Sequence, residues 1–328
     1  MNRVLITGGA GYLGAVLTKK LLDRGYFVRV LDPLIFGQEP LKAVSVNGQF
    51  DLQVGLTEDN YILEKCLTNI DAVVHLSGLS NDPSCELNAE LTKKVNIEAT
   101  KNLLALCRKK GVKRIVNASS CSVYGFTEGK AVDESSELNP LTAYASSKVA
   151  CEELMFNESS EDLVVTSLRK ATLYGPSPRM RFDLVVNTFT GMALSEGKII
   201  INGGQQWRPF VHVDDACEAH IFMLEADAKL INRQNFNVGD NEQNYKIIDL
   251  AYMIAEYLPN VKIDHSNSPD ARSYRANFDK INNLGWKVKK NVQDGVLGIK
   301  EMFDKKEIVD FRDLNYFNIK RMISYLNV

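Results

Sequence analysis

The chain has 328 residues, a net charge of −2 and 45% hydrophobic residues, which is enough for one large domain or two ordinary ones. This charge balance excludes a basic nucleic-acid-binding surface and a long charged tail, and no apolar run approaches the roughly 20 residues that span a bilayer. The six cysteines have no metal-ligand spacing with the four histidines, and no signal peptide precedes the first strand. We therefore expect a globular cytoplasmic protein with reduced thiols, no metal site, no membrane association and no nucleic-acid partner.

Strand-like and helix-like patterns alternate along the first half of the chain. Short apolar runs predict strands, whereas apolar residues three and four positions apart predict helices. The alternation predicts a Rossmann fold of the α/β class, a doubly wound parallel sheet with helices on both faces and right-handed crossovers. The expected strands are residues 3–8, 27–32, 49–55, 71–78, 112–120 and 163–175, and the expected helices are 11–25, 90–111 and 142–159.

The pattern loosens after residue 170. We expect a loop rich in proline and arginine at 175–182, a strand and helix that return to the sheet at 208–226, another helix at 245–258 and a loop at 268–274. Because no repeat or low-complexity linker separates two units, we expect a smaller C-terminal lobe interleaved with the first domain. The expected division is a Rossmann domain of residues 1–170 with 209–238 returning to it, a smaller lobe of 171–208 and 239–308, and a tail helix within 309–328.

The stretch ITGGAGYLG, residues 6–14, places four glycines after the first strand and at the start of the first helix. Gly9, Gly11 and Gly14 give the spacing GxGxxG, and Gly8 with the last two gives GxxGxxG. Such glycines allow a sharp turn, close approach of a pyrophosphate to the backbone, and close packing of the helix on the sheet. The helix N-terminus then offers free N–H groups to the phosphates. The alternative is a purely structural turn, which the strand before it and the helix after it disfavour.

Asp32 ends the second strand, roughly 20 residues after the turn, where a carboxylate accepts hydrogen bonds from a ribose diol. The same carboxylate repels a 2′-phosphate and no arginine follows it, so we expect NAD rather than NADP and assign the first domain to NAD binding. The adenine contact stays open, because Leu56 stands where an acid often follows the third strand. Asp51, Asp59 or backbone groups are the alternatives.

Tyr144 and Lys148 form a YxxxK pair on one face of an expected helix. A phenol with a pKa of about 10 is a weak base at pH 7, but a neighbouring ammonium and an oxidised nicotinamide favour the phenolate and lower its pKa. Lys148 is also placed to hold the nicotinamide ribose. The pattern alone occurs often by chance on an exposed helix face. It gains weight from the serine cluster that ends the fifth strand, because ligands bind at the carboxyl ends of such strands.

Six short motifs occur in order along the chain: TGGAGYLG, HLSG, VN at 95–96, SSCSVYG, YASSK and RPFVHVDD. Together they resemble the extended short-chain dehydrogenase/reductase superfamily, in its NAD-dependent epimerase/dehydratase family, whose members act on nucleotide sugars. The resemblance covers residues 1–305 and leaves the tail outside. The motifs specify the superfamily more closely than they specify the reaction.

The resemblance implies roles for particular residues. Tyr144 matches the catalytic base, Lys148 its partner, and Ser120 the residue that hydrogen-bonds the sugar oxygen being oxidised. His75 lies near the cofactor in this family through its backbone, and a structural role is the simpler expectation for its side chain. Asn96 resembles a helix residue that supports the site. The implied NAD-binding residues are Gly8, Gly11, Tyr12, Leu13, Gly14, Asp32, Leu76, Ser77, Gly78, Asn96, Tyr144 and Lys148.

Dehydratases of this family carry Asp-Glu directly after the serine, and these acids remove the 6-hydroxyl of the sugar. The two positions here are Cys121 and Ser122. Neither is a carboxylic acid, and a thiol with a pKa of about 8.5 is a weak replacement. The resemblance therefore argues against 4,6-dehydration, and it places both side chains at the substrate.

Arginine suits the two phosphates of a nucleotide sugar, because its planar fork binds phosphate oxygens in pairs. Arg208 and Arg272 match family arginines that contact the substrate diphosphate. Arg179, Arg181 and Asn187 lie in or near a loop that we connect with the same substrate-binding pocket. For Arg179 and Arg181, a solvated surface charge is an equal alternative.

These observations predict an NAD-dependent nucleotide-sugar epimerase that acts at C4 through a transient 4-keto intermediate. A nucleotide-sugar C4 dehydrogenase or ketoreductase with a net redox change uses the same residues and is the alternative. A 4,6-dehydratase and a non-catalytic NAD-binding regulator are less favoured. By resemblance alone we expect a homodimer, formed through helices near 88–110 and 143–158.

Overall fold

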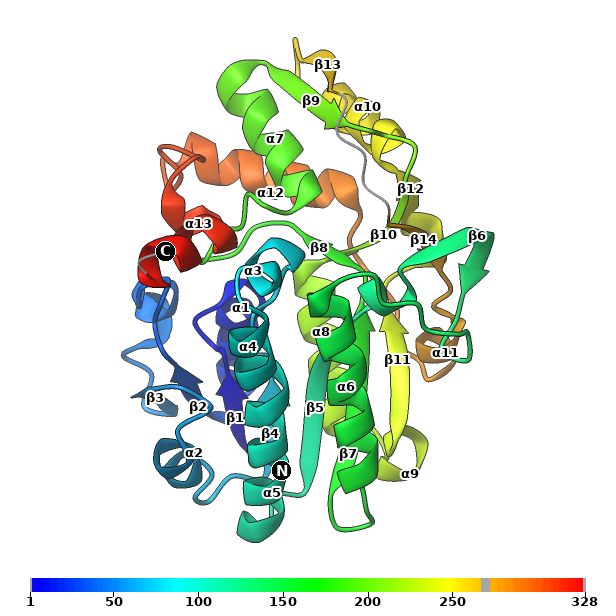
Figure 1. Ribbon diagram of the computed structural model, residues 1–328. Coiled ribbons are helices and arrows are strands. Elements are labelled where there is room, and N and C mark those ends of the chain that lie inside the picture. The colour runs from blue at the N-terminus through cyan, green and yellow to red at the C-terminus, as the bar shows by residue number, and fades with distance from the viewer. Residues whose placement is uncertain (1, 267–271, 327–328) are drawn as a thin grey trace.

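The computed structural model describes residues 2–266 and 272–326, so most of the loop expected at 268–274 lies outside the described residues. Seven parallel strands form the central sheet in the order β11-β7-β5-β4-β1-β2-β3 (Figure 1), and the expected Rossmann fold is confirmed. The chain crosses from β3 back to β4, beside β1, and ligands of such sheets bind at the carboxyl ends of the strands at this reversal. The strands are β1 (Arg3–Thr7), β2 (Phe27–Asp32), β3 (Phe50–Val54), β4 (Ala72–His75), β5 (Arg114–Ser120), β7 (Val164–Lys170) and β11 (Gln234–Val238).

Helices cover both faces of this sheet. Side chains alternate along β1, so that Val4 and Ile6 enter one core and Leu5 enters the other. Helices α1 and α8 pack on each other over the first face, and α2, α5 and α6 cover the second (Figure 1). A π-helical turn at Lys93–Glu98 joins α4 to α5. The helices are α1 (Tyr12–Asp23), α2 (Asn60–Cys66), α3 (Asp82–Glu86), α4 (Ala89–Thr92), α5 (Ala99–Lys110), α6 (Ala143–Glu158), α8 (Val213–Glu225) and α9 (Ala228–Ile231).

The smaller lobe sits beyond the carboxyl ends of the main sheet (Figure 1). Its strands pair as β12-β10-β8, β13-β9 and β14-β6, and helices α7, α10 and α12 pack around its core. The strands are β6 (Phe126–Val132), β8 (Thr172–Tyr174), β9 (Lys198–Asn202), β10 (Trp207–His212), β12 (Asn244–Lys246), β13 (Lys262–Ser266) and β14 (Ser273–Ala276). The helices are α7 (Val185–Glu196), α10 (Ile247–Tyr257), α11 (Asp279–Asn283) and α12 (Val292–Asp304).

Two expectations about strands were wrong. The single strand expected at 163–175 is divided at Ala171 into β7 of the main sheet and β8 of the three-stranded sheet. The strand expected to return to the main sheet at 208 is β10, which pairs with β8 and β12 instead; helix α8 and strand β11 are the parts that lie on or in the main sheet. A continuous apolar run carries no signal that the chain changes sheets, because both sides of the break are buried.

The tail forms helix α13 (Asn318–Leu326) after a short 3₁₀ turn at Leu314–Tyr316. Met322 of α13 packs with Leu79 and Cys85 of the segment that follows β4. The tail therefore lies beside the loops at the carboxyl edge of the main sheet. Within the described ranges, no helix is long and apolar enough to cross a membrane.

Candidate active site

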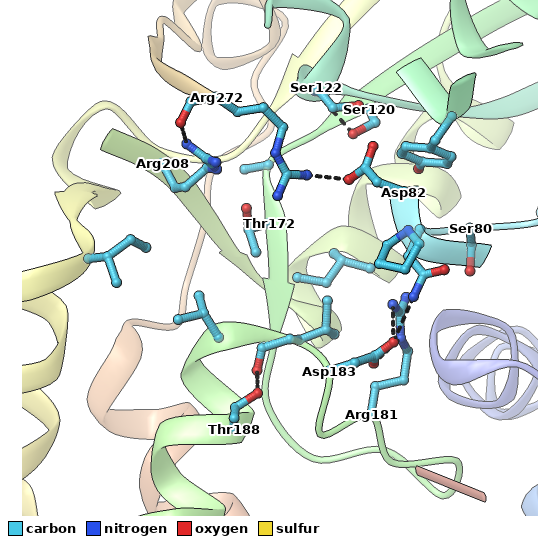
Figure 2. A pocket seen from close by; sticks show the side chains of 18 of the residues that line it. Ser80, Asp82, Ser120, Ser122, Thr172, Arg181, Asp183, Thr188, Arg208 and Arg272 are labelled. Carbon is cyan, nitrogen blue, oxygen red and sulfur yellow. Dashed lines mark hydrogen bonds and ion pairs between the residues drawn. The ribbon is translucent and has the colours of Figure 1, made fainter. Parts of the chain in front are cut away.

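A cleft of about 1070 Å³ opens between the carboxyl ends of the main sheet and the smaller lobe, and its size suits a small-molecule site. Ser120 at the end of β5 and Lys170 at the end of β7 line it from the sheet. Arg208 and Arg272 line it from the lobe, and Asp82 of α3 faces them (Figure 2). The cleft thus brings together residues from both halves of the chain.

The glycine turn joins β1 to α1 beside this cleft. Gly8 has φ +76°, and a Cβ there would lie 2.9 Å from the Ser77 backbone nitrogen. A Cβ on Gly14 would lie 2.3 Å from the Gly8 carbonyl oxygen, so close packing of helix on turn requires glycine. A Cβ on Gly11 would meet only that carbonyl, at 3.2 Å. Gly11 also begins α1 without a side-chain cap, so the turn leaves open space and free N–H groups that fit a pyrophosphate.

Asp32 holds the turn in place from the end of β2. Its carboxylate accepts hydrogen bonds from the backbone nitrogens of Ala10, at 3.0 Å, and Leu34, at 2.8 Å. The side chain is buried, and burial raises the pKa of Asp32 although both hydrogen bonds oppose the shift. The carboxylate therefore lies between the glycine turn and the loop after β2, where a dinucleotide would place its adenosine ribose.

Asp32→Ala should weaken NAD binding about 10- to 100-fold, the cost of losing hydrogen bonds to a charged acceptor. NADP binding should fall less, because the substitution also removes a charge that repels the 2′-phosphate. Calorimetric titration of both dinucleotides into the variant and the wild type measures the two effects. A larger loss for NADP than for NAD would contradict a contact between Asp32 and the ribose.

The segment after β4 lies against the glycine turn. The Leu76 nitrogen donates to the Thr7 carbonyl at 3.0 Å, and Ser77 hydrogen-bonds Thr57 at 2.7 Å. Leu76 and Ser77 thus border the turn, and Gly78 follows them against Asn96. Asn96 lies below them: its amide oxygen accepts from the Leu79 nitrogen at 2.8 Å, and its amide nitrogen donates to Ser147 at 2.9 Å. Asn96 is buried, and its hydrogen bonds connect this segment to α6.

The other candidates near the dinucleotide have structural partners. Tyr12 donates to the Gly175 carbonyl at 2.6 Å, and the Leu13 side chain is buried in the core beneath the turn. His75 lies between Thr7, at 2.8 Å, and Thr100, at 3.0 Å, and burial lowers its pKa to about 3, which keeps the imidazole neutral.

The two carboxylates considered for the adenine contact are also engaged. Asp51 forms an ion pair with Arg29 at 2.6 Å. Asp59 caps α2 by accepting hydrogen bonds from the nitrogens of Tyr61 and Ile62. Because both carboxylates already have partners, backbone groups are the remaining alternative for the adenine contact.

Ser120, Tyr144 and Lys148 come together where β5 ends against α6. The Ser120 hydroxyl accepts a hydrogen bond from the Ser122 nitrogen at 3.1 Å, and Ser120 contributes to lowering the pKa of Tyr144. Lys148, one turn after Tyr144 on α6, holds its Nζ 5.6 Å from the centre of the tyrosine ring. Ser120 and Tyr144 both line the cleft. Strand and helix thus place a hydroxyl and a phenol at one point of the cleft, with an ammonium beside the phenol.

The expected lowering of the Tyr144 pKa includes the charge of an oxidised nicotinamide and stays a prediction; the protein residues alone raise this pKa. Burial raises the pKa of Tyr144, and this outweighs the lowering by Lys148, by Ser120 and by Arg181. Asp82 adds to the increase. The phenol is therefore the stable form at neutral pH, and the positive charge of an oxidised nicotinamide would shift the balance toward phenolate.

Two expected substrate contacts lie away from the cleft. Cys121 is fully buried and its thiol donates to the Arg169 carbonyl at 3.1 Å, whereas Ser122 lines the cleft. Asn187 is also fully buried; it accepts from the Gly175 nitrogen at 2.9 Å and donates to the Arg181 carbonyl at 2.9 Å. The assignments of Cys121 and Asn187 to substrate binding were therefore wrong, because adjacent side chains leave a strand end or a helix in different directions.

Of the two arginines in the loop after β8, Arg181 lines the cleft and Arg179 does not. Arg181 lines the cleft and pairs with Asp183 at 2.8 Å (Figure 2). Arg179, expected at the same pocket, is not among the residues that line it. Its guanidinium lies 3.8 Å from the centre of the Phe36 ring, beyond β2. The expectation that Arg179 contacts the substrate was therefore wrong, and neither arginine is a solvated surface charge.

The opposite wall carries the other two arginines, and they face a carboxylate that the sequence patterns missed. Arg208 donates to the carbonyl oxygens of Trp207, at 2.8 Å, and Arg272. The Arg272 side chain forms an ion pair with Asp82 across the cleft (Figure 2). Only the fold brings α3 opposite the lobe, so no local signal identifies Asp82. A diphosphate that binds Arg272 would compete with Asp82 for its guanidinium.

Lys170 is a second cleft residue that the patterns missed. It pairs with Ser120 in the register between β5 and β7, and its Nζ donates to the Ser119 carbonyl at 3.0 Å. Burial, with a smaller contribution from Lys148, lowers the pKa of Lys170 to about 7. Its position at a strand end was the available signal, because polar side chains there face the ligand site.

Lys170→Met should stabilise the protein by about 1–2 kcal/mol at pH 6 and by less at pH 9, because it removes a partly buried ammonium. Below pH 7 the folded and unfolded states both carry the proton, and the burial penalty is complete. Between pH 7 and 10.5 only the unfolded chain keeps the proton, so the wild type gains stability as the pH rises. Urea unfolding at both pH values measures the difference, and an equal effect at both would contradict the lowered pKa.

A parallel sheet with a glycine turn at its reversal point, and a serine and a tyrosine that face a cleft at the end of β5 with a lysine beside the tyrosine, define a Rossmann-type enzyme that uses a nicotinamide dinucleotide. A model of the NAD dependent epimerase/dehydratase family matches residues 4–239, and the chain belongs to this family. Its cofactor is accordingly NAD.

Individual relatives are distant but of nearly equal length. The chain is 27% identical to a UDP-glucose 4-epimerase of Lactobacillus helveticus, over 95% of this chain and 99% of the relative. It is also 27% identical to a UDP-N-acetyl-alpha-D-glucosaminuronate decarboxylase of Bacillus cytotoxicus, over 92% and 91%. The structure of MoeE5 in complex with UDP-glucose and NAD superposes with a TM-score of 0.80 at 27% identity, over 93% of this chain and 100% of MoeE5. The relatives thus catalyse more than one reaction.

Proposed function

We propose that this protein is an NAD-dependent nucleotide-sugar epimerase that inverts C4 through a transient 4-keto sugar. One observation carries the proposal: Ser120 and Tyr144 face the same cleft as Arg208 and Arg272 from its opposite wall. A nucleotide sugar needs both groups, because its diphosphate must be held while its ring reacts several ångströms away.

The residues act as follows in this proposal. NAD supplies the acceptor and donor of the C4 hydride. Tyr144, as a phenolate that Lys148 stabilises, takes the proton of the C4 hydroxyl and becomes a phenol, and Ser120 hydrogen-bonds the sugar oxygen. Arg208 and Arg272 hold the diphosphate while the 4-keto sugar turns over in the cleft. Tyr144 then returns the proton when hydride comes back to the other face.

The residues after Ser120 disfavour dehydration. Elimination of the 6-hydroxyl requires a proton donor and a base beside C6. Cys121 is turned into the core, and Ser122, whose hydroxyl has no hydrogen-bond partner among the described residues, is the group that faces the cleft. A hydroxyl is a weaker proton donor than a carboxylic acid and a weaker base than a carboxylate, so epimerisation, or oxidation and reduction at C4, is favoured.

The test is incubation with UDP-, GDP-, dTDP- and CDP-sugars, with UDP-sugars first because the relatives named above act on them. Proton NMR identifies the product, and absorbance of the reduced nicotinamide shows whether the redox state changes. A C4 epimer without net NADH supports the proposal. Stoichiometric NADH formation would establish the dehydrogenase alternative, and loss of the 6-hydroxyl would establish the dehydratase.

The proposed assembly is a homodimer through α5 and α6, which lie side by side on one face of the sheet (Figure 1). Two such helices from each copy would form a four-helix interface. Light scattering of the purified protein tests this, since a mass of 36.7 kDa is that of a single chain.

A further inference from the structure

Arg179 is a buried cation whose guanidinium is only partly hydrogen-bonded by the described residues. It is 4% exposed, its Nη2 donates to the Asn318 amide oxygen at 2.6 Å, and its Nε has no hydrogen-bond partner. Within the described part of the chain, no carboxylate lies at ion-pair distance from it. Burial lowers the pKa of Arg179, although a guanidinium keeps its proton at neutral pH. A buried charge in this state gains from an anion that completes its coordination.

The surroundings of Arg179 belong to the dinucleotide half of the site. The Arg179 nitrogen donates to the Ser177 hydroxyl at 3.2 Å, and that hydroxyl donates to the Tyr12 carbonyl at 2.7 Å. The loop is thereby fastened to the first turn of α1, next to the glycine turn. The guanidinium stacks on Phe36, in the loop that follows Asp32, and it is electrostatically coupled to Asp32 itself.

The tail helix fixes this arrangement through Asn318, which is 5% exposed. Its amide oxygen holds Arg179, and its amide nitrogen donates to the Ser80 hydroxyl at 2.9 Å. Three residues further on, Arg321 donates to the Ile35 carbonyl at 2.7 Å and fixes the loop that carries Phe36. Helix α13 therefore contacts the loops after β2 and β4 as well as the arginine.

We propose that Arg179 binds a phosphate of the dinucleotide and that Asn318 of the tail helix positions it there. This inference rests on the proposed function, because it takes dinucleotide binding at the glycine turn as given. Among the described residues neither Nε nor Nη1 has a hydrogen-bond partner, so these donors are left for a phosphate oxygen, whereas Asn318 holds Nη2 and the Phe36 ring stacks on the guanidinium. Arg208 and Arg272 line the cleft instead, so the two diphosphates have separate arginines. The tail, which no family motif covers, becomes part of the cofactor site.

The test compares three probes by calorimetry: ADP, which carries the cofactor's diphosphate; adenosine, which lacks it; and UDP, which represents the substrate. Arg179→Gln should weaken ADP binding by about tenfold or more, the size of a lost charge-assisted hydrogen bond. Adenosine and UDP binding should stay within about twofold, and Arg179→Lys, which keeps the charge, should recover part of the ADP affinity. Arg312→Gln is the matched control, because Arg312 is an exposed tail guanidinium paired with Glu196.

Unchanged ADP binding in Arg179→Gln, with a melting temperature near that of the wild type, would overturn the inference. A loss for UDP in place of ADP would overturn it too and would return Arg179 to the substrate. If the wild type binds neither ADP nor NAD, the protein has no dinucleotide site and the proposed function fails as well.

Asn318 is tested as a positioning residue by a double-mutant cycle. Asn318→Ala should weaken ADP binding in the wild type but add nothing in the Arg179→Gln background, since its effect passes through the arginine. Asn318→Asp puts a carboxylate against the guanidinium and should weaken ADP binding at least as much as Asn318→Ala, because the carboxylate competes with the phosphate. Equal losses from Asn318→Ala in both backgrounds would show that the helix acts independently of Arg179, and would overturn this part of the proposal.

Discussion

Tyr144→Phe should lower kcat by about a thousandfold, within the range that a positioned general base contributes, while the protein still folds and binds NAD. The substitution removes a single oxygen, that of the phenol which lines the cleft with Ser120. Lys148, 5.6 Å from the ring centre, would then have no phenolate to stabilise. Turnover of the nucleotide sugar that the panel identifies measures the loss, and calorimetric titration measures NAD binding.

The matched control is Tyr61→Phe, the same chemical change on a side chain that is 80% exposed and lies on α2. It should leave turnover unchanged. If Tyr144→Phe keeps kcat within about tenfold of the wild type, a loss far below that of a general base, the proton passes through another group and the proposed mechanism fails.

The larger domain was predictable because its signals are local. Apolar runs mark the buried strands, and glycines or acids at fixed distances mark the turn and the ribose contact, so β1, α1 and Asp32 follow from short segments. The smaller lobe was much less predictable. Its helix α7 contains β-branched residues and a glycine, which favour no single structure. Helix α12 did carry a signal, the capping box of Asn291 and Asp294, which the pattern search missed.

The candidate site likewise contains residues that local patterns predict and residues that they do not. Tyr144 and Lys148 were predictable because one helix turn fixes their relation, whatever the rest of the chain does. The side-chain directions of Cys121 and Arg179 were not, because a strand end and a loop acquire them only from distant partners such as Asn318. Asp82 and Lys170 reach the cleft through the arrangement of whole elements, which no motif of a few residues encodes.

Helix α6, which carries Tyr144 and Lys148, is held against the sheet by a buried ion pair. The carboxylate of Glu152, two turns after Tyr144, accepts two hydrogen bonds from Arg169 of β7, from Nη2 at 2.7 Å and from Nε at 2.9 Å. It also accepts from the Ser119 hydroxyl at 2.5 Å and from Asn235 at 3.0 Å. Only 3–4% of each charged side chain is exposed. Four donors therefore converge on one carboxylate directly behind the strand that ends in Ser120.

Glu152→Ala should lower the free energy of unfolding by about 3–5 kcal/mol, because it leaves the Arg169 guanidinium buried without its counter-charge. Glu158→Ala is the matched control on the same helix. Its ion pair with Arg108, at 2.9 Å, is 41–55% exposed, and such pairs contribute only about 0–1 kcal/mol. Urea unfolding of both variants measures the difference.

The same pair sets a second expectation for Glu152→Ala, at temperatures where the variant is still folded. Helix α6 carries Tyr144 and Lys148, whereas β5 carries Ser120, so loosening the helix changes the distance between groups that must act together. We expect kcat to fall by about tenfold or more, because the rate depends steeply on the positions of the catalytic groups. The affinity for UDP should be kept, because Arg208 and Arg272 lie in the other lobe. Losses of unfolding free energy as small as those of Glu158→Ala would show that the pair does not anchor the helix.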